Sequence, residues 1–118
     1  MGSGSLHAGA SLQLPVNVRG IQLGRPVDLL LDLDAWNVLG FVVLCGDGSS
    51  RFLVFAAADV REDAVAVSSA LLLLEDVDFY RDRSRSLRDL LSGGELLDLL
   101  VAADGSAEAV ESESVPTA

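Results

Sequence analysis

The stretch of residues 24–44 constrains the fold more than any other part of the chain. Two apolar, β-prone runs flank a polar turn that contains Asp32 and Asp34 and ends at Trp36. Strand-forming residues on both sides of a short polar turn are typical of a β-hairpin. This stretch therefore predicts a pair of antiparallel strands in a chain that is mainly β.

Alternation of apolar and polar residues, and short apolar runs between turn residues, predict further strands. The expected strands span 11–19, 27–33, 38–45, 51–57, 64–67 and 71–75. Residues 86–91 predict one short C-terminal helix, because Ser86 can cap its start and Gly93 and Gly94 can end it. The predicted fold is therefore mainly β, with about six strands and one helix.

The composition changes at both ends of the chain. Residues 1–10 are rich in Gly and Ser, which predicts a flexible N-terminal segment. Residues 106–118 are acidic, rich in Ser and without aromatics, which predicts a disordered tail. We expect the barrel-forming domain to lie between them, over residues 11–76.

One internal similarity concerns the region after that domain, over residues 77–105. The run 94–101 repeats the pattern of 24–31, and each run leads into a turn that contains Asp. We therefore expect the short helix to be followed by a degenerate partial repeat of the hairpin. A chance likeness of two Leu-rich strands is the alternative.

The charge balance bears on the class of partner. The formal net charge is −10, with 8 Arg and no Lys. Because nucleic-acid binding depends on basic surface that neutralises phosphates, we expect no nucleic-acid partner. The apolar runs are too short for a membrane span, so we expect no membrane insertion. A basic protein partner suits the charge better.

Cysteine usage and hydrophobic content bear on compartment and assembly. Cys45 is the only cysteine, which excludes an intramolecular disulfide. Residues 1–5 lack the basic-then-apolar layout of a signal peptide, so we expect a cytoplasmic protein. Half of the residues are hydrophobic. In so small a chain, this predicts apolar surface left over for a homodimer contact.

The region from Leu14 to Glu75 resembles the PRC-barrel family. This family includes the cytoplasmic domain of the photosynthetic reaction-centre H subunit and the C-terminal domain of the ribosome maturation factor RimM. The matching motifs follow in order: Val18–Gly20, Gly24–Asp32, Val38–Val43, Phe52–Phe55 leading to Asp59–Val60, and Asp63–Val67. The resemblance implies a small, strongly bent antiparallel PRC-type β-barrel of six strands.

The resemblance also implies a type of function. PRC-barrels are adaptor modules without a shared active site, and stand-alone copies often dimerise. We therefore expect a non-enzymatic protein–protein interaction or scaffold module that forms a homodimer, with no catalytic residue and no cofactor. Two alternatives stay open: a ribosome-assembly factor similar to the RimM barrel, and a divalent-cation-binding domain.

The cation alternative depends on Asp28, Asp32 and Asp34. Their even spacing puts them on one face of an extended strand, and hard cations take several carboxylate oxygens. The pattern lacks the Gly and distal Glu of an EF-hand loop, so a solvated face with turn-forming aspartates is the preferred interpretation. For Asp28, mid-strand among apolar residues, we expect an ion pair with Arg19 or Arg25 or a backbone hydrogen bond.

Three aromatic residues are candidate interface anchors. Trp36 follows the hairpin turn, and Phe79 and Tyr80 follow the last strand of the expected barrel. Trp and Tyr are frequent hot spots at interfaces, although each of these residues could instead pack over an end of the barrel. Cys45 is expected to be a small packing residue, because the only histidine, His7, lies in the terminal segment and offers it no base.

Overall fold

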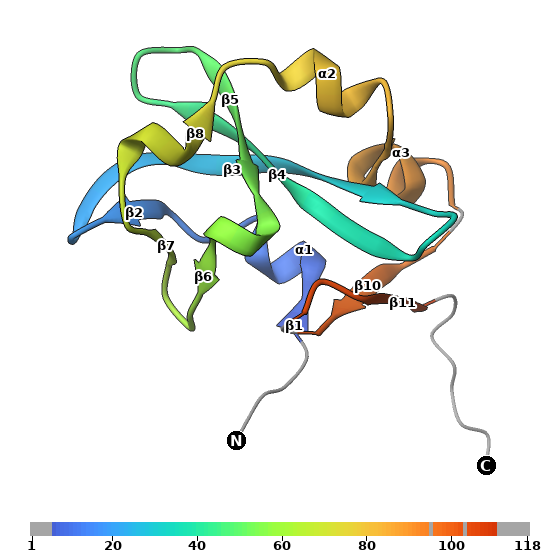
Figure 1. Cartoon of the computed structure of the whole chain (residues 1–118). Helices are drawn as coiled ribbons and strands as arrows, with labels where there is room; N and C mark the ends of the chain where they lie inside the picture. Colours follow the sequence, from blue (N-terminus) through green and yellow to red (C-terminus); the bar gives the residue numbers. More distant parts are fainter. Residues whose placement is uncertain (1–5, 95, 103, 111–118) are drawn as a thin grey trace.

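The computed structural model describes residues 6–94, 96–102 and 104–110 of the chain (Figure 1). Its regular elements are mostly strands, as expected. In chain order they are β1 (Leu6–His7), α1 (Ala8–Ser11), β2 (Val16–Val18), β3 (Ile21–Asp32), β4 (Asn37–Cys45), β5 (Ser50–Val54), η1 (Phe55–Ala57), β6 (Asp59–Val60), β7 (Val65–Val67), η2 (Ala70–Leu72), β8 (Leu73–Leu74), α2 (Val77–Arg81), β9 (Arg85–Ser86), α3 (Leu87–Ser92), β10 (Asp98–Val101) and β11 (Ala107–Val110).

The predicted hairpin is confirmed and is the centre of the larger sheet. β3 and β4 pair antiparallel from Gly24 opposite Cys45 to Asp32 opposite Asn37, and β5 pairs with the other edge of β4. The sheet order is β6-β7-β2-β3-β4-β5-β8, with β9 on part of β3. Among the residues that the structure describes, no pairing joins β6 to β8 and closes this sheet into a barrel.

One pairing departs from the all-antiparallel expectation. β2 lies parallel to β7, with Val16 opposite Val65 and Val18 opposite Val67, so the sheet is mixed. Parallel strands need a long connection between them, and here the β3–β5 meander lies between β2 and β7. Such a pairing of remote strands leaves no trace in the local pattern of either one.

Both ends of the described chain depart from the prediction of flexible segments. His7 in β1 pairs with Leu100 of β10, and β10 forms a hairpin with β11 around Asp104. These three strands make a second sheet, in the order β1-β10-β11. Ala8 at the start of α1 is fully buried. The expected flexibility and disorder are therefore wrong for 6–10 and 106–110, whereas 1–5 and 111–118 lie outside the described residues.

The larger sheet packs apolar side chains on both faces. Leu29, Phe41 and Leu53 belong to the main core, together with side chains from α1, α3 and β10. Their chain neighbours Leu30 and Phe52 belong to a second, smaller cluster. Because side chains of a strand alternate between faces, the two clusters lie on opposite sides of the sheet.

Within the described residues, three short α-helices stand where one helix was expected. α3 is the predicted helix: Ser86 caps it by accepting a hydrogen bond from the Asp89 amide at 3.3 Å. Gly94, which follows it, has a φ of 76°, a conformation that glycine adopts at little cost. α1 and α2 have only 4 and 5 residues, too short for a helical period to show in the sequence.

Candidate interaction site

Two of the predicted interface anchors lie together on α2. Asp76 caps this helix by accepting a hydrogen bond from the Phe79 amide at 3.3 Å. The Tyr80 ring stacks on Phe52 of β5 with a centroid separation of 4.0 Å, and Phe79 meets Tyr80 edge-on at 5.0 Å. The Arg83 guanidinium lies 3.8 Å from the Phe79 ring centroid. These contacts fix both rings and anchor α2 to the sheet.

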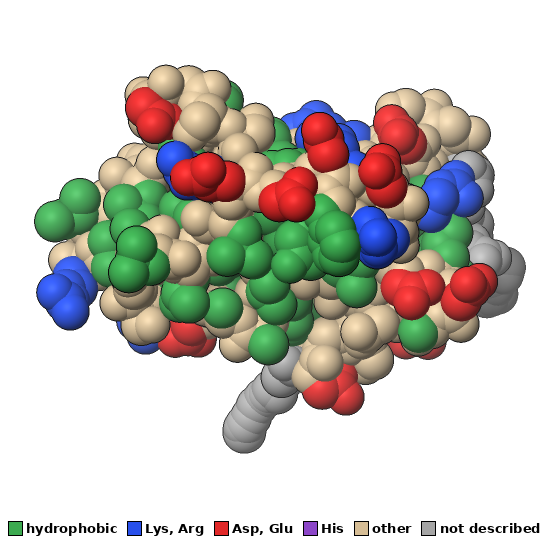
Figure 2. Space-filling model, turned by 45° about the horizontal axis from the view of Figure 1, so that its top comes forward, with side chains coloured by type: hydrophobic (Ala, Val, Ile, Leu, Met, Phe, Trp, Pro, Cys, Tyr) green, Lys and Arg blue, Asp and Glu red, His purple; other side chains and the backbone are tan. Residues whose placement is uncertain are grey.

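The surface around this aromatic stack is apolar and only partly covered. Phe79 is 45 % exposed, and Tyr80 is half-buried. Beside them lie partly buried residues of the second cluster: Val27, Leu39, Val54 and Leu74. We call Phe79, Tyr80 and these four residues the α2 face. Figure 2 shows hydrophobic side chains in a band across one side of the molecule, with charged side chains along its upper border.

The third predicted anchor, Trp36, is not part of the α2 face. It lies in the β3–β4 turn with a φ of 50° and is 39 % exposed. Its carbonyl oxygen accepts a hydrogen bond from the Ala107 amide at 2.8 Å. Trp36 therefore belongs to the contact between this turn and β11, whereas α2, which carries Phe79 and Tyr80, packs beside β5 (Figure 1).

Asp28 is buried and serves as an acceptor inside the fold. Its carboxylate accepts hydrogen bonds from the Ser86 hydroxyl, from the Arg88 amide at 3.1 Å and from the Leu29 amide at 2.8 Å. The expected backbone hydrogen bond is confirmed. In place of the expected ion pair with Arg19 or Arg25, the carboxylate accepts hydrogen bonds from the Arg88 backbone amide and the Ser86 hydroxyl. Asp28 thus joins β3 to the start of α3.

Asp32 and Asp34 lie apart from Asp28, at the end of the hairpin. Asp32 accepts a hydrogen bond from the Asp34 amide at 2.9 Å. An aspartate that binds the backbone amide two residues further on is typical of a turn. A β-bulge between Leu30 and Leu31 interrupts the alternation on which the common face depended. Within the described ranges, no three His, Cys, Asp or Glu side chains are grouped so that they could hold a metal ion.

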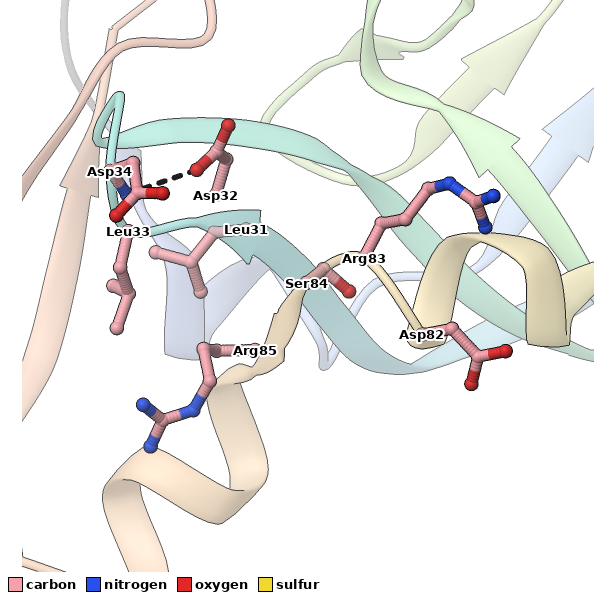
Figure 3. Close-up of a pocket in the computed structure, with 8 residues that line it drawn as sticks. All are labelled: Leu31, Asp32, Leu33, Asp34, Asp82, Arg83, Ser84 and Arg85. Atoms are coloured by element: carbon pink, nitrogen blue, oxygen red, sulfur yellow. Dashed lines mark hydrogen bonds between the residues drawn. The ribbon is translucent and has the colours of Figure 1, made fainter.

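A groove separates the hairpin end from the segment that follows α2. It has a volume of ≈ 440 Å³ and is lined by residues 31–34 and 82–85. Figure 3 shows the Arg83 and Arg85 side chains pointing away from each other, while Asp32 and Asp34 stay close to their own turn. The charged groups therefore do not converge on one point, as binding of a small ionic ligand would require.

In two turns, hydrogen bonds lower the pKa of an aspartate carboxyl. Hydrogen bonds from the Ser49 hydroxyl and amide hold the pKa of the Asp47 carboxyl below its ordinary value of 3.8. The Ser106 amide and hydroxyl lower the pKa of Asp104 in the same way. Both carboxyls are fully exposed and each accepts from a Ser two residues on. These shifts report turn formation and not a reactive site.

His7 and Cys45 lie on different sheets and do not meet. One carboxylate oxygen of Asp98 lies 3.1 Å from the His7 Nδ1 atom. The other carboxylate oxygen accepts a hydrogen bond from the Gly9 amide at 2.9 Å. Cys45 ends β4 and is half-buried. His7 thus helps to hold β1 and α1 on β10, a role that the sequence does not show.

One surface feature was missed by sequence reasoning, at the end of the sheet where the β2–β3 turn, the β4–β5 turn and η2 meet. Leu71 is 87 % exposed there, and Ile21 is 65 % exposed. A groove of ≈ 490 Å³ beside them is lined in part by Leu23, Cys45 and Leu73. The available signal was the run of four leucines at 71–74, since an alternating strand cannot bury all four on one face.

Two comparisons with known proteins find no relative of the chain. A scan against protein-family models finds no family that matches the chain. A search of curated proteins likewise finds no match. Among the described residues, no helix has the length and apolar character that crossing a membrane requires.

Proposed function

We propose that this chain is a non-enzymatic, cytoplasmic protein–protein interaction module of the PRC-barrel type, which acts as a homodimer and docks a further protein on its α2 face. The observation that carries this proposal is the aromatic stack of Phe79, Tyr80 and Phe52. It holds an exposed ring in a fixed position beside partly covered apolar side chains.

The α2 face has the composition of an interface centre. Aromatic residues are enriched in such centres, and a preformed ring loses little conformational freedom on binding. Exposed Asp76, Asp78 and Asp82 share this segment with Arg81 and with Arg83, which lies on the Phe79 ring, so the local border carries both signs of charge. The net charge of −10 of the whole chain favours a partner that presents an apolar side chain flanked by Arg or Lys, and such charge complementarity mainly accelerates association and selects the partner.

The experiment compares the full-length chain with Phe79→Asp. Proteins retained from a cell extract are quantified for both, and the protein with the largest ratio is purified and titrated against each form. We expect Phe79→Asp to weaken its binding at least about tenfold, as loss of a hot-spot aromatic does. Phe79→Ala is the milder second variant, and circular dichroism verifies that both variants fold.

The matched control is Leu97→Asp. Leu97 is 53 % exposed and precedes β10, so the substitution adds the same charge away from the α2 face. Binding should survive this change. A purified partner that binds the wild type and Phe79→Asp equally well would place the docking surface elsewhere. If extracts contain no protein that Phe79→Asp depletes, the proposed function is wrong.

A further inference from the structure

We propose that a second copy of this chain docks on the end of the sheet around Leu71, in a two-fold arrangement in which the Leu71 side chain of each copy enters the groove of the other. This inference deepens the proposed function and rests on its homodimer component. We call Leu71, Ile21 and the groove lined by Leu23, Cys45 and Leu73 the end patch.

Hydrogen bonds of the turn from Ser69 to Leu72 keep the Leu71 side chain exposed to solvent. The Ser69 hydroxyl oxygen accepts a hydrogen bond from the Leu71 amide at 3.1 Å, and the Ser69 carbonyl accepts from the Leu72 amide at 3.1 Å. Leu72 and Leu73 pack against the main core, and Leu74 packs on the opposite face. Because its three neighbours are anchored inward, Leu71 has no buried position within its own chain.

The groove lies beside this protruding side chain. Leu71 itself forms part of its border, and Leu23, Cys45 and Leu73 give it an apolar floor. A surface that carries both a projection and a matching hollow can contact a copy of itself about a two-fold axis, so that the assembly closes at two subunits. Ile21, which is exposed near Leu23, extends the apolar area around the groove.

The charges around the end patch favour a second copy over other occupants. The chain as a whole carries −10, so two copies repel each other over most of their surfaces. Around the end patch, Arg19 and Arg51 are balanced by Asp47 and Glu75, and Arg51 lies 3.4 Å from Glu75. Two copies can therefore meet here with little like-charge repulsion, whereas a strongly basic partner gains nothing from this surface.

The first test is sedimentation equilibrium of the full-length chain over a range of concentrations. We expect a monomer–dimer equilibrium whose dissociation constant rises at least about tenfold in Leu71→Asp. Leu97→Asp is the matched control and should dimerise as the wild type does. Added salt should not weaken the dimer, because the contact is apolar and salt screens the remaining repulsion.

The second test uses the only thiol of the chain as a reporter. Cys45 lines the groove and is half-buried, so in the proposed dimer the two thiols lie within the same contact region. A short bis-maleimide should join two wild-type chains, should join two Leu97→Asp chains equally well, and should join few Leu71→Asp chains. Cys45→Ser, which removes the thiol, reports any reaction at other groups.

The outcomes separate the dimer site from the proposed function. A wild-type chain that stays monomeric at several hundred micromolar overturns both this inference and the homodimer component. A dimer that Leu71→Asp leaves intact overturns the site alone, and heterologous capture through Leu71 without self-association assigns the end patch to another protein. In each case, loss of partner binding in Phe79→Asp is measured separately and decides the docking function of the α2 face.

Discussion

Replacing Asp28 by alanine tests the link between β3 and α3. The carboxylate is 6 % exposed and accepts two hydrogen bonds from the α3 side, from the Ser86 hydroxyl and the Arg88 amide. Hydrogen bonds to charged groups contribute about 1.5–3 kcal/mol each. Asp28→Ala leaves both donors without this acceptor in a site that water hardly reaches, so we expect the free energy of unfolding to fall by about 3–6 kcal/mol.

Urea denaturation followed by circular dichroism measures this loss. With a slope of about 2 kcal/mol/M for a domain of this size, the midpoint should fall by about 1.5–3 M. Because small domains have only about 5–15 kcal/mol in total, the alanine variant could be too unstable to fold. Asp28→Asn is therefore the second variant. It keeps the shape and one acceptor oxygen, and we expect a loss of about 1–2 kcal/mol.

A double-mutant cycle with Ser86→Ala isolates the contact itself. If the Asp28 carboxylate and the Ser86 hydroxyl interact as the structure shows, the two losses should be non-additive by about 1 kcal/mol or more. Asp34→Ala is the matched control, because Asp34 is exposed in the turn and its removal should cost less than about 0.5 kcal/mol. Asp28 variants as stable as Asp34→Ala would refute the reasoning.

Further expectations concern the glycines and the turns. Gly40→Ala should lower the free energy of unfolding by about 2 kcal/mol or more, because a Cβ atom there overlaps the Leu53 carbonyl and lies 2.6 Å from Phe52 Cζ. Gly46→Ala, with open space around it, should change it by less than about 0.5 kcal/mol, and equal effects in urea denaturation would contradict the packing argument. The pKa of Asp47 and that of Asp104 are lowered in the folded chain, so each carboxylate stabilises the fold above its unfolded pKa and this contribution is lost as the pH falls through the folded value. Asp47→Asn and Asp104→Asn should therefore be less stable than the wild type at pH 7 and approach it below pH 3.8, and NMR titration of the wild type should give midpoints below that value.

Elements with purely local determinants could be predicted from the sequence. The β3–β4 hairpin needed two strand-forming runs and a polar turn, and α3 needed a serine cap and terminal glycines. Phe79 and Tyr80 could be proposed as candidates because they are aromatic residues that directly follow the last strand of the expected barrel. For these features, the interacting residues lie within one turn or one hairpin, so the pattern of residues carries the information.

Features that join remote segments could not be predicted. The partner of Asp28 is 58 positions away, and hydrophobic patterning does not encode which donor meets a buried carboxylate. The exposure of Leu71 depended on how its three neighbours are anchored, and the bulge in β3 separated aspartates that a regular strand would align. The stacking of Tyr80 on Phe52 likewise required the position of α2 over β5.

The contacts of β3 also set an order for folding during synthesis. Its pairing with β4, and that of β4 with β5, joins neighbouring segments, so the three-stranded meander can form soon after Val54 has left the ribosome. Docking of β9 and α3 on β3 closes a far longer loop than the pairings within the meander, so it has the higher cost in chain entropy. A nascent chain that ends before Ser86 therefore contains a formed hairpin whose Asp28 carboxylate is still hydrated. Dehydration of that carboxylate, coupled to the docking of α3, becomes a late step of folding.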